Sequence, residues 1–257
     1  MPGFESGADA GAKPGTSSTP SASRVSIVIP CYNEAVHIAE VVARVRAADL
    51  GGLEREIIVV DDGSSDGTGA VLESLDGITH LSHPVNRGKG AAVKTGFAAA
   101  AGRIVLIQDA DLEYDPGDCR AVIAPILEGR ADAVLGSRFA YERPHFFFGE
   151  RRSPFFAHYI GNLTIIALTN LLYGHDATDY EGAYKAFRRE VVAGLPIEAD
   201  GFEYDNELVC KLLRLGRRVI EVPIAYHPRS YEEGKKIHWH HGLRIVWTIL
   251  KWRFLPL

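Results

Sequence analysis

The chain has 257 residues, of which 46% are hydrophobic and 24% are charged, and its formal net charge is −5. This composition is that of a globular protein with a sizeable core, and the acidic balance argues against a nucleic-acid binder, which would present a basic face. The three cysteines, Cys31, Cys119 and Cys210, are too few and too far apart for a disulfide framework or a zinc motif. A reducing, cytoplasmic setting fits best.

Residues 1–23 differ in composition from the rest of the chain. They are rich in Gly, Ser, Thr, Pro and Ala, and Phe4 is the only large apolar side chain after Met1. Such a segment cannot bury enough apolar surface to order itself, and it lacks the apolar core of a signal peptide. We therefore expect a disordered tail over 1–23, one domain over 24–236 and a C-terminal amphipathic helix over 237–257.

From residue 24 onward, predicted strands alternate with predicted helices. Runs rich in Val and Ile predict strands at 25–30, 56–60, 78–81, 104–108, 131–136, 183–187 and 218–224. Apolar spacing or composition predicts helices at 38–45, 91–101, 118–128 and 201–215, with Asn33 as the N-cap of the first. This alternation is typical of right-handed βαβ units. The predicted fold is a single α/β domain, Rossmann-like, with a mostly parallel sheet and helices on both faces.

The strand at 104–108 runs into four acidic residues at alternating positions, Asp109, Asp111, Glu113 and Asp115. The carboxyl ends of parallel strands form the sheet edge that binds ligands. Four carboxylates this close repel one another by roughly 1 to 4 kcal/mol per near pair. A hard divalent cation would relieve the repulsion, and a phosphorylated substrate commonly supplies its remaining ligands. A solvated acidic turn is the alternative interpretation.

Polar turns also follow the other predicted strands and fall on the same edge. They are Pro30-Cys31-Tyr32-Asn33-Glu34, Asp61-Asp62-Gly63-Ser64, Asn86-Arg87-Gly88-Lys89-Gly90 and Gly136-Ser137-Arg138, and a basic segment follows at 226–236. No GxxxxGK[ST] phosphate loop is present, and no GxGxxG follows the first strand.

Together with Asp109-Ala110-Asp111, these segments resemble the family 2 glycosyltransferases of GT-A fold, and among them the dolichyl- and polyprenyl-phosphate mannose synthases. The motifs run in the order of that family through nearly all of the chain after the tail. The resemblance implies a metal-dependent, inverting transfer of one hexose from a nucleotide-diphosphate sugar of the GDP-mannose or UDP-glucose type. It implies Mg²⁺ or Mn²⁺ as cofactor and a polyprenyl phosphate as acceptor.

The resemblance also implies which residues bind the donor. Pro30, Tyr32, Glu34 and Asp61 would line the base and ribose, with Asp62 beside them and Gly88 and Lys89 passing the nucleoside. Asp109 and Asp111, with Ala110 between them, match the metal-binding DXD motif. Glu113 stands where the related synthases have Gln, and it would be a third metal ligand. For Asp61 and Asp62, capping of the turn is the alternative role.

Three residues would act at the reacting centre: Asp111, Arg138 and Asp179. Arg138 would grip a phosphate bidentately, and a structural ion pair is its alternative role. A lipid phosphate is already anionic and needs no base. A hydroxyl acceptor needs a carboxylate, for which Asp179, Glu203 and Asp205 are the candidates.

Within the basic segment, Arg229 and Lys235 would contact the diphosphate, and Lys236 is the alternative to Lys235. The alternative for this segment as a whole is a solvated basic loop.

Two predicted helices bear on the membrane. Residues 153–174 carry no formal charge, but a polar stripe favours a half-buried helix over a membrane span. Over 239–254 an apolar face lies opposite a strip with Arg244, Thr248 and Lys251, and the apolar face consists of Leu243, Val246, Trp247, Leu250 and Phe254. We expect peripheral docking on the inner face of the membrane, and packing of the helix onto the sheet is the alternative.

Rival functions fit the sequence less well. A sugar-phosphate nucleotidyltransferase should carry a Gly-rich loop with Arg and Lys after the first strand, and a non-catalytic adaptor would not need the acidic pair. The QxxRW signature of processive synthases is absent. A family 2 enzyme that acts on a hydroxyl of a soluble or glycolipid acceptor remains the main alternative.

Overall fold

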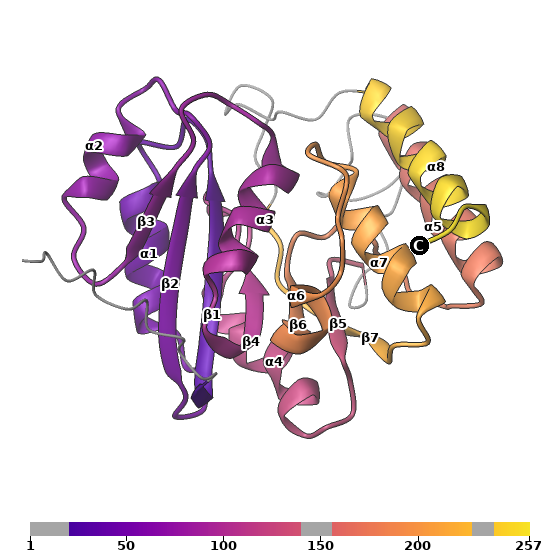
Figure 1. The fold of residues 1–257 in the computed structure, drawn as a ribbon, viewed down its shortest axis with the longest axis horizontal. Coiled ribbons are helices and arrows are strands. Elements are labelled where there is room, and N and C mark those ends of the chain that lie inside the picture. Colours follow the sequence, from indigo (N-terminus) through magenta and orange to yellow (C-terminus); the bar gives the residue numbers. More distant parts are fainter. Residues whose placement is uncertain (1–20, 140–155, 228–238) are drawn as a thin grey trace, which may run out of the picture.

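The computed structural model describes residues 21–139, 156–227 and 239–257 (Figure 1). Within these residues, seven strands form one sheet in the order β3-β2-β1-β4-β6-β5-β7. The strands are β1 (Ser21–Cys31), β2 (Glu54–Asp61), β3 (Thr79–Ser82), β4 (Gly102–Ile107), β5 (Ala133–Ser137), β6 (Lys185–Arg188) and β7 (Val219–Pro223). Only β6 among them runs antiparallel to its neighbours, β4 and β5. The predicted α/β fold with a mostly parallel sheet is therefore confirmed.

The first strand begins earlier than the sequence predicted. β1 starts at Ser21, which pairs with Gly102 of β4, so residues 21–23 belong to the sheet and not to the tail. A Cβ on Gly102 would lie 2.8 Å from the carbonyl oxygen of Arg24, so the absence of a side chain lets the two strands approach. Pairing of the backbone requires no apolar side chains, which is why composition placed the boundary too late.

The described helices are α1 (Ile38–Ala47), α2 (Thr68–Glu73), α3 (Lys89–Ala99), α4 (Cys119–Leu127), α5 (Phe156–Tyr173), α6 (Arg189–Ala193), α7 (Tyr204–Arg214) and α8 (Trp239–Phe254), with a 3₁₀ turn η1 (Pro116–Asp118) before α4. The sequence did not predict α2 and α6, because each is too short to show a helical period. Asn33 is not the cap of α1, which His37 precedes. Asn33 has a φ of 52°, and its side-chain oxygen accepts a hydrogen bond from the backbone N–H of Ser65.

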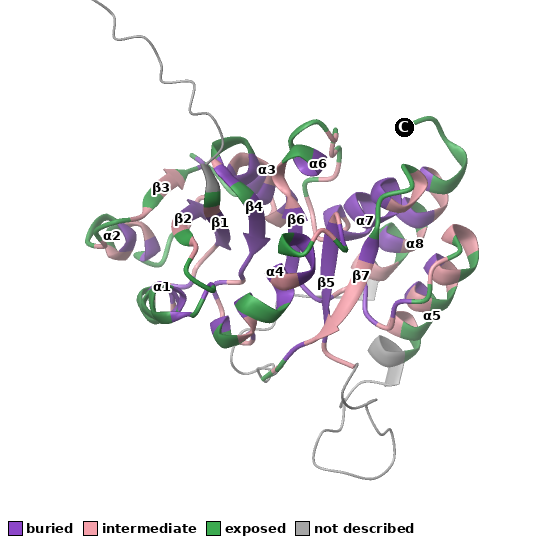
Figure 2. Cartoon of the chain, turned by 90° about the horizontal axis from the view of Figure 1, so that it is seen from below, coloured by how far each residue is buried: buried purple, intermediate pink, exposed green. Residues whose placement is uncertain are grey.

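The sheet is covered on both faces. Along β1, Ile27 and Ile29 point into the core on the side of α1 and α4, whereas Val28 points toward α3 and α7 on the opposite side. Figure 2 shows the two helical layers with the sheet between them. Strands buried on both faces read as continuous apolar runs, which explains why the sequence pattern identified them.

A third apolar cluster joins α5, α7 and α8 beside the sheet (Figure 1), and its buried members are Ile165, Cys210, Ile245, Ile249 and Trp252. α8 therefore packs on α5 and α7 and not on the sheet, which was the alternative interpretation. Thr248, predicted to lie on the polar strip, is buried, whereas Leu243 and Trp247 are 65% and 64% exposed. α8 thus has one apolar stripe in the core and a second one at the surface. Among the residues described, no helix is long and apolar enough to cross a membrane.

Candidate active site

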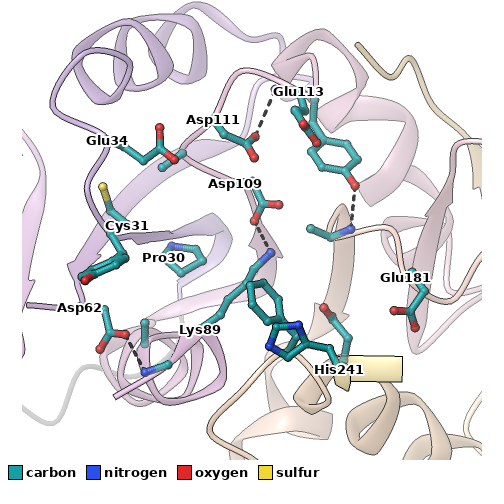
Figure 3. Close-up of a pocket in the computed structure, with 18 of the residues that line it drawn as sticks. Pro30, Cys31, Glu34, Asp62, Lys89, Asp109, Asp111, Glu113, Glu181 and His241 are labelled. Carbon is teal, nitrogen blue, oxygen red and sulfur yellow. Dashed lines mark hydrogen bonds and ion pairs between the residues drawn. The ribbon is translucent and has the colours of Figure 1, made fainter. Parts of the chain in front are cut away.

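A cavity of about 430 Å³ opens where β1, β2 and β4 end (Figure 3). The turns after these strands and the N-terminus of α3 line one side of it. The opposite wall comes from later parts of the chain: Arg138, Glu181, Phe202, Asp205, Tyr226, His241 and Ile245. The fold therefore brings the predicted polar turns to one site.

The acidic stretch forms the centre of the cavity wall, where Asp109, Ala110, Asp111 and Glu113 all line the cavity. The Nζ of Lys89 lies 2.6 Å from Oδ1 of Asp109. Burial alone would lower the pKa of Lys89, but the charges of Asp109, Asp205 and Asp111 outweigh it and raise this pKa. The first helical residue of α3 thus supplies a cation that the acidic stretch itself lacks.

The carboxylates of Asp109, Asp111 and Glu113 suit a hard divalent cation, but they do not converge on one point. The hydroxyl of Tyr226 donates to Oε2 of Glu113 at 2.9 Å, and Lys89 holds Asp109. In the described part of the chain, no three His, Cys, Asp or Glu side chains are grouped closely enough to hold a metal. The expected set of Asp109, Asp111 and Glu113 is therefore not preassembled. Mg²⁺ is commonly held by one or two carboxylates together with substrate phosphates, and these residues fit that arrangement.

At the nucleoside end, Pro30, Tyr32, Glu34 and Asp62 line the cavity. Asp61, which was predicted to contact the base, does not line the cavity. Successive side chains of a strand point to opposite faces, and Asp61 points away from the face of α3. Its Oδ1 accepts the backbone N–H of Ser64 at 3.0 Å, so Asp61 caps the turn.

Asp62 holds the turn that leads into α3. Its carboxylate accepts the backbone N–H groups of Arg87 and Gly88 at 3.0 and 2.7 Å, and it contacts Nδ1 of His83 at 2.6 Å. Gly88 also lines the cavity, with a φ of 100°, and a Cβ there would overlap the carbonyl oxygen of Asp200. The glycine therefore permits close packing against residue 200.

Arg138 lines the cavity, but its guanidinium is paired with Asp179. Nε and Nη2 of Arg138 donate to the two carboxylate oxygens of Asp179 at 2.7 and 2.9 Å, and its backbone N–H donates at 3.1 Å. Burial would raise the pKa of Asp179, but the charge and hydrogen bonds of Arg138 hold it below its usual range. The structural ion pair is thus present. The Nε and Nη2 edge of the guanidinium, which could bind a phosphate bidentately, is therefore occupied by Asp179.

Asp179 itself is fully buried and does not reach the cavity. It also accepts the backbone N–H groups of Glu181 and Gly182, both at 3.1 Å. A carboxylate with this many partners and a lowered pKa is a poor proton acceptor. The structure therefore corrects the expected base: Asp179 orients Arg138.

Sequence reasoning gave no role to Glu181, which lines the cavity. Its Oε1 accepts Nδ2 of Asn206 at 2.6 Å. Burial raises the pKa of Glu181 and Asp205 adds to the rise, although Asn206, Lys185 and Arg138 oppose it. The available signal was its position two residues after Asp179, which the sequence predicted at the reacting centre. The predicted phosphate contacts Arg229 and Lys235, like Lys236, lie outside the described residues.

Comparison with known proteins places the chain in a family. The model of the family described as "Glycosyl transferase family 2" matches residues 26–195. The chain belongs to glycosyl transferase family 2. Because the match ends before α7, the wall formed by Phe202, Asp205, His241 and Ile245 lies beyond the matched part of this glycosyltransferase.

Three similar proteins are sugar transferases by name. Glycosyltransferase AglJ of Haloferax volcanii is 31% identical over 82% of this chain and 65% of its own length. Dolichol-phosphate mannosyltransferase of Pyrococcus furiosus is 31% identical over 89% and 64%. Polyprenol monophosphomannose synthase of Mycolicibacterium smegmatis is 30% identical over 82% and 80%. The chain thus spans slightly less than two thirds of the first two relatives.

Among solved structures, glucosyl-3-phosphoglycerate synthase of Mycobacterium tuberculosis, in complex with Mn²⁺, UDP and phosphoglyceric acid, superposes with a TM-score of 0.67. It is 24% identical, and the likeness covers 91% of this chain and 79% of that one. This likeness and the family match together confirm the predicted GT-A fold of this glycosyltransferase.

Proposed function

We propose that this family 2 glycosyltransferase moves one hexose, with inversion, from a nucleotide-diphosphate sugar to a polyprenyl phosphate at the cytoplasmic face of a membrane. The observation that carries the proposal is that α8 contributes residues both to the cavity wall and to the exposed apolar surface. His241 and Ile245 on α8 line the cavity, while Leu243 and Trp247 on the same helix are exposed. The names of the mannose synthase relatives support the lipid acceptor.

The donor would lie across the acidic stretch. Its nucleoside would occupy the end lined by Pro30 and Tyr32, and its diphosphate would lie beside Asp109 and Asp111. Asp111 and Glu113 would hold Mg²⁺ or Mn²⁺ together with the diphosphate. The ion, when bound, neutralises charge that develops on the leaving group.

Because the carboxylates are not preassembled, the metal and the nucleotide should bind together. Mn²⁺ alone should raise the melting temperature very little. A nucleoside diphosphate added with Mn²⁺ should raise it by several degrees, because only the complex completes the oxygen ligands. Differential scanning fluorimetry with Mn²⁺, UDP, GDP and each pair measures this. An equally large shift with Mn²⁺ alone would contradict the shared site.

The three carboxylates predicted as bases for a hydroxyl acceptor are either paired or absent from the cavity wall. Two of the three candidate bases are held in ion pairs: Asp179 by Arg138, and Asp205 by Lys185 at 2.9 Å. The third, Glu203, does not line the cavity. A phosphate oxygen is anionic and attacks without a base, so it requires none of them.

The surface of α8 would dock on the bilayer. No acidic residue occurs in this helix, and Arg244 and Arg253 are exposed on it, as are Leu243 and Trp247. Lys251, expected among the membrane contacts, instead lies 2.5 Å from Glu198, so its charge is offset. An apolar stripe flanked by arginines is suited to the surface of an anionic membrane.

A double substitution tests this surface. Arg244→Glu with Arg253→Glu should weaken binding to vesicles of phosphatidylcholine and phosphatidylserine by several kcal/mol, on the order of 1 per unit of charge reversed. Arg44→Glu with Arg46→Glu, on exposed positions of α1, is the matched control and should bind as the wild type does. Co-sedimentation across a salt series measures both. Equal losses in the two variants, or a wild type that does not sediment at low salt, would refute the docking surface.

The function itself is tested with a matched pair of acceptors. A short polyprenyl phosphate and the corresponding alcohol are each incubated with UDP-glucose or GDP-mannose and Mn²⁺, and release of nucleoside diphosphate is followed. We expect the phosphate to accelerate the release and the alcohol to have no effect. Acceleration by the alcohol alone would refute the phosphate acceptor.

A further inference from the structure

The cavity has a second polar end, away from the nucleoside. Figure 3 shows Glu181 across the cavity from Pro30 and Cys31, with Asp109 between them. Phe202 and His241 close the wall on this side, with ring centroids 5.2 Å apart. Since the diphosphate of a nucleotide sugar lies between its nucleoside and its hexose, a donor held by the acidic stretch directs its hexose toward Glu181.

The bonding of Glu181 differs from that of the other acids at this end. Arg138 pairs with Asp179 and Lys185 pairs with Asp205. Within the described chain, Glu181 forms no ion pair, and its side chain accepts one hydrogen bond, from Asn206 to Oε1. Oε2 is therefore left to accept hydrogen bonds from a ligand.

We propose that Glu181 binds hydroxyl groups of the donor hexose and determines which sugar the enzyme accepts. A carboxylate oxygen accepts hydrogen bonds from neutral hydroxyls, and such charge-assisted bonds are stronger than neutral ones. The same carboxylate would repel an acceptor phosphate, so it suits the sugar and not the attacking group. This inference rests on the proposed nucleotide-sugar donor and is independent of which acceptor is used.

Asn206 is the positioning residue for this carboxylate. By fixing Oε1 of Glu181, it determines the direction in which Oε2 points. Its own Oδ1 is buried and has no hydrogen-bond partner among the described residues. Asn206 does not line the cavity, so it acts on the hexose only through Glu181.

The test compares the affinity for a nucleoside diphosphate with that for the matching nucleotide sugar. UDP with UDP-glucose, and GDP with GDP-mannose, are titrated calorimetrically in Mn²⁺ without acceptor. Glu181→Gln should bind the nucleoside diphosphate as the wild type does but bind the nucleotide sugar roughly ten- to a hundredfold more weakly, which is the range for a charged hydrogen bond. Unchanged affinity for the diphosphate also shows that the variant is folded. Glu73→Gln, at an exposed position on α2, should change neither affinity.

Each other outcome overturns the proposal. A fall in turnover with the affinity for the nucleotide sugar unchanged would assign Glu181 to the acceptor or to proton transfer. A parallel loss of both affinities would assign it to the nucleotide or to the fold, and no change in either would remove it from the site. A wild type that binds neither nucleoside diphosphates nor nucleotide sugars would refute the donor class, and with it this role of Glu181. A failed lipid acceptor leaves these titrations unaffected, so the two failures are distinguishable.

Discussion

Asp111→Asn should lower the rate of hexose transfer by at least roughly a hundredfold, because charge stabilisation by a bound metal is worth several kcal/mol at the transition state. The fold should survive, since the Asp111 side chain is half-exposed on the cavity wall. Turnover is measured at saturating Mn²⁺, and the melting temperature is measured in parallel.

Asp115→Asn is the matched control for this substitution. Asp115 belongs to the same acidic stretch but is exposed, does not line the cavity and accepts a hydrogen bond from Gly117 at the start of η1. It should retain nearly full activity. Near-normal turnover of a folded, metal-replete Asp111→Asn variant would remove Asp111 from the catalytic machinery.

Asp179→Asn should destabilise the protein by about 3 to 5 kcal/mol, because it leaves the guanidinium of Arg138 without its counter-charge. The Asp179 side chain is fully buried and that of Arg138 is 15% exposed, so solvent screens the pair weakly. The free energy of unfolding in urea measures the loss. Asp179→Asn combined with Arg138→Met should lose less than the sum of the two single variants. A loss under about 1 kcal/mol for Asp179→Asn, or strict additivity, would contradict the account of this pair.

The sign of the pH dependence follows from the lowered pKa of Asp179 in the folded state. A carboxyl with a depressed folded pKa stabilises the protein fully above its unfolded value, about 3.9 for Asp. That stability is lost as the pH falls through the folded pKa. The difference in stability between the wild type and Asp179→Asn should therefore shrink in strong acid.

Much of the fold could be predicted because its signals are local. Buried strands read as runs such as Val59 and Val60, and their carboxyl ends carry the polar turns that line the cavity. Asp61 was misplaced, although strand alternation alone separates it from Asp62. Its role was assigned from the family motif, which does not say to which face of the sheet the Asp61 side chain points.

The partners in the ion pairs could not be predicted, because they are distant in the sequence. Arg138 lies 41 positions from Asp179. Any of several acids could have paired with it, and only tertiary packing selects one. α8 was ambiguous for a different reason: it carries two apolar stripes, and periodicity alone does not say which of them is buried.

The central claim is transfer of a hexose onto a lipid phosphate, and identification of the product tests it most directly. The protein is incubated with a nucleotide sugar, Mn²⁺ and a short polyprenyl phosphate, and the lipid fraction is analysed by mass spectrometry and NMR. We predict a hexosyl-phosphoryl-polyprenol whose anomeric configuration is inverted relative to the donor. Nucleoside diphosphate formed without any glycosylated lipid, or a hexose attached to a hydroxyl, would contradict the claim.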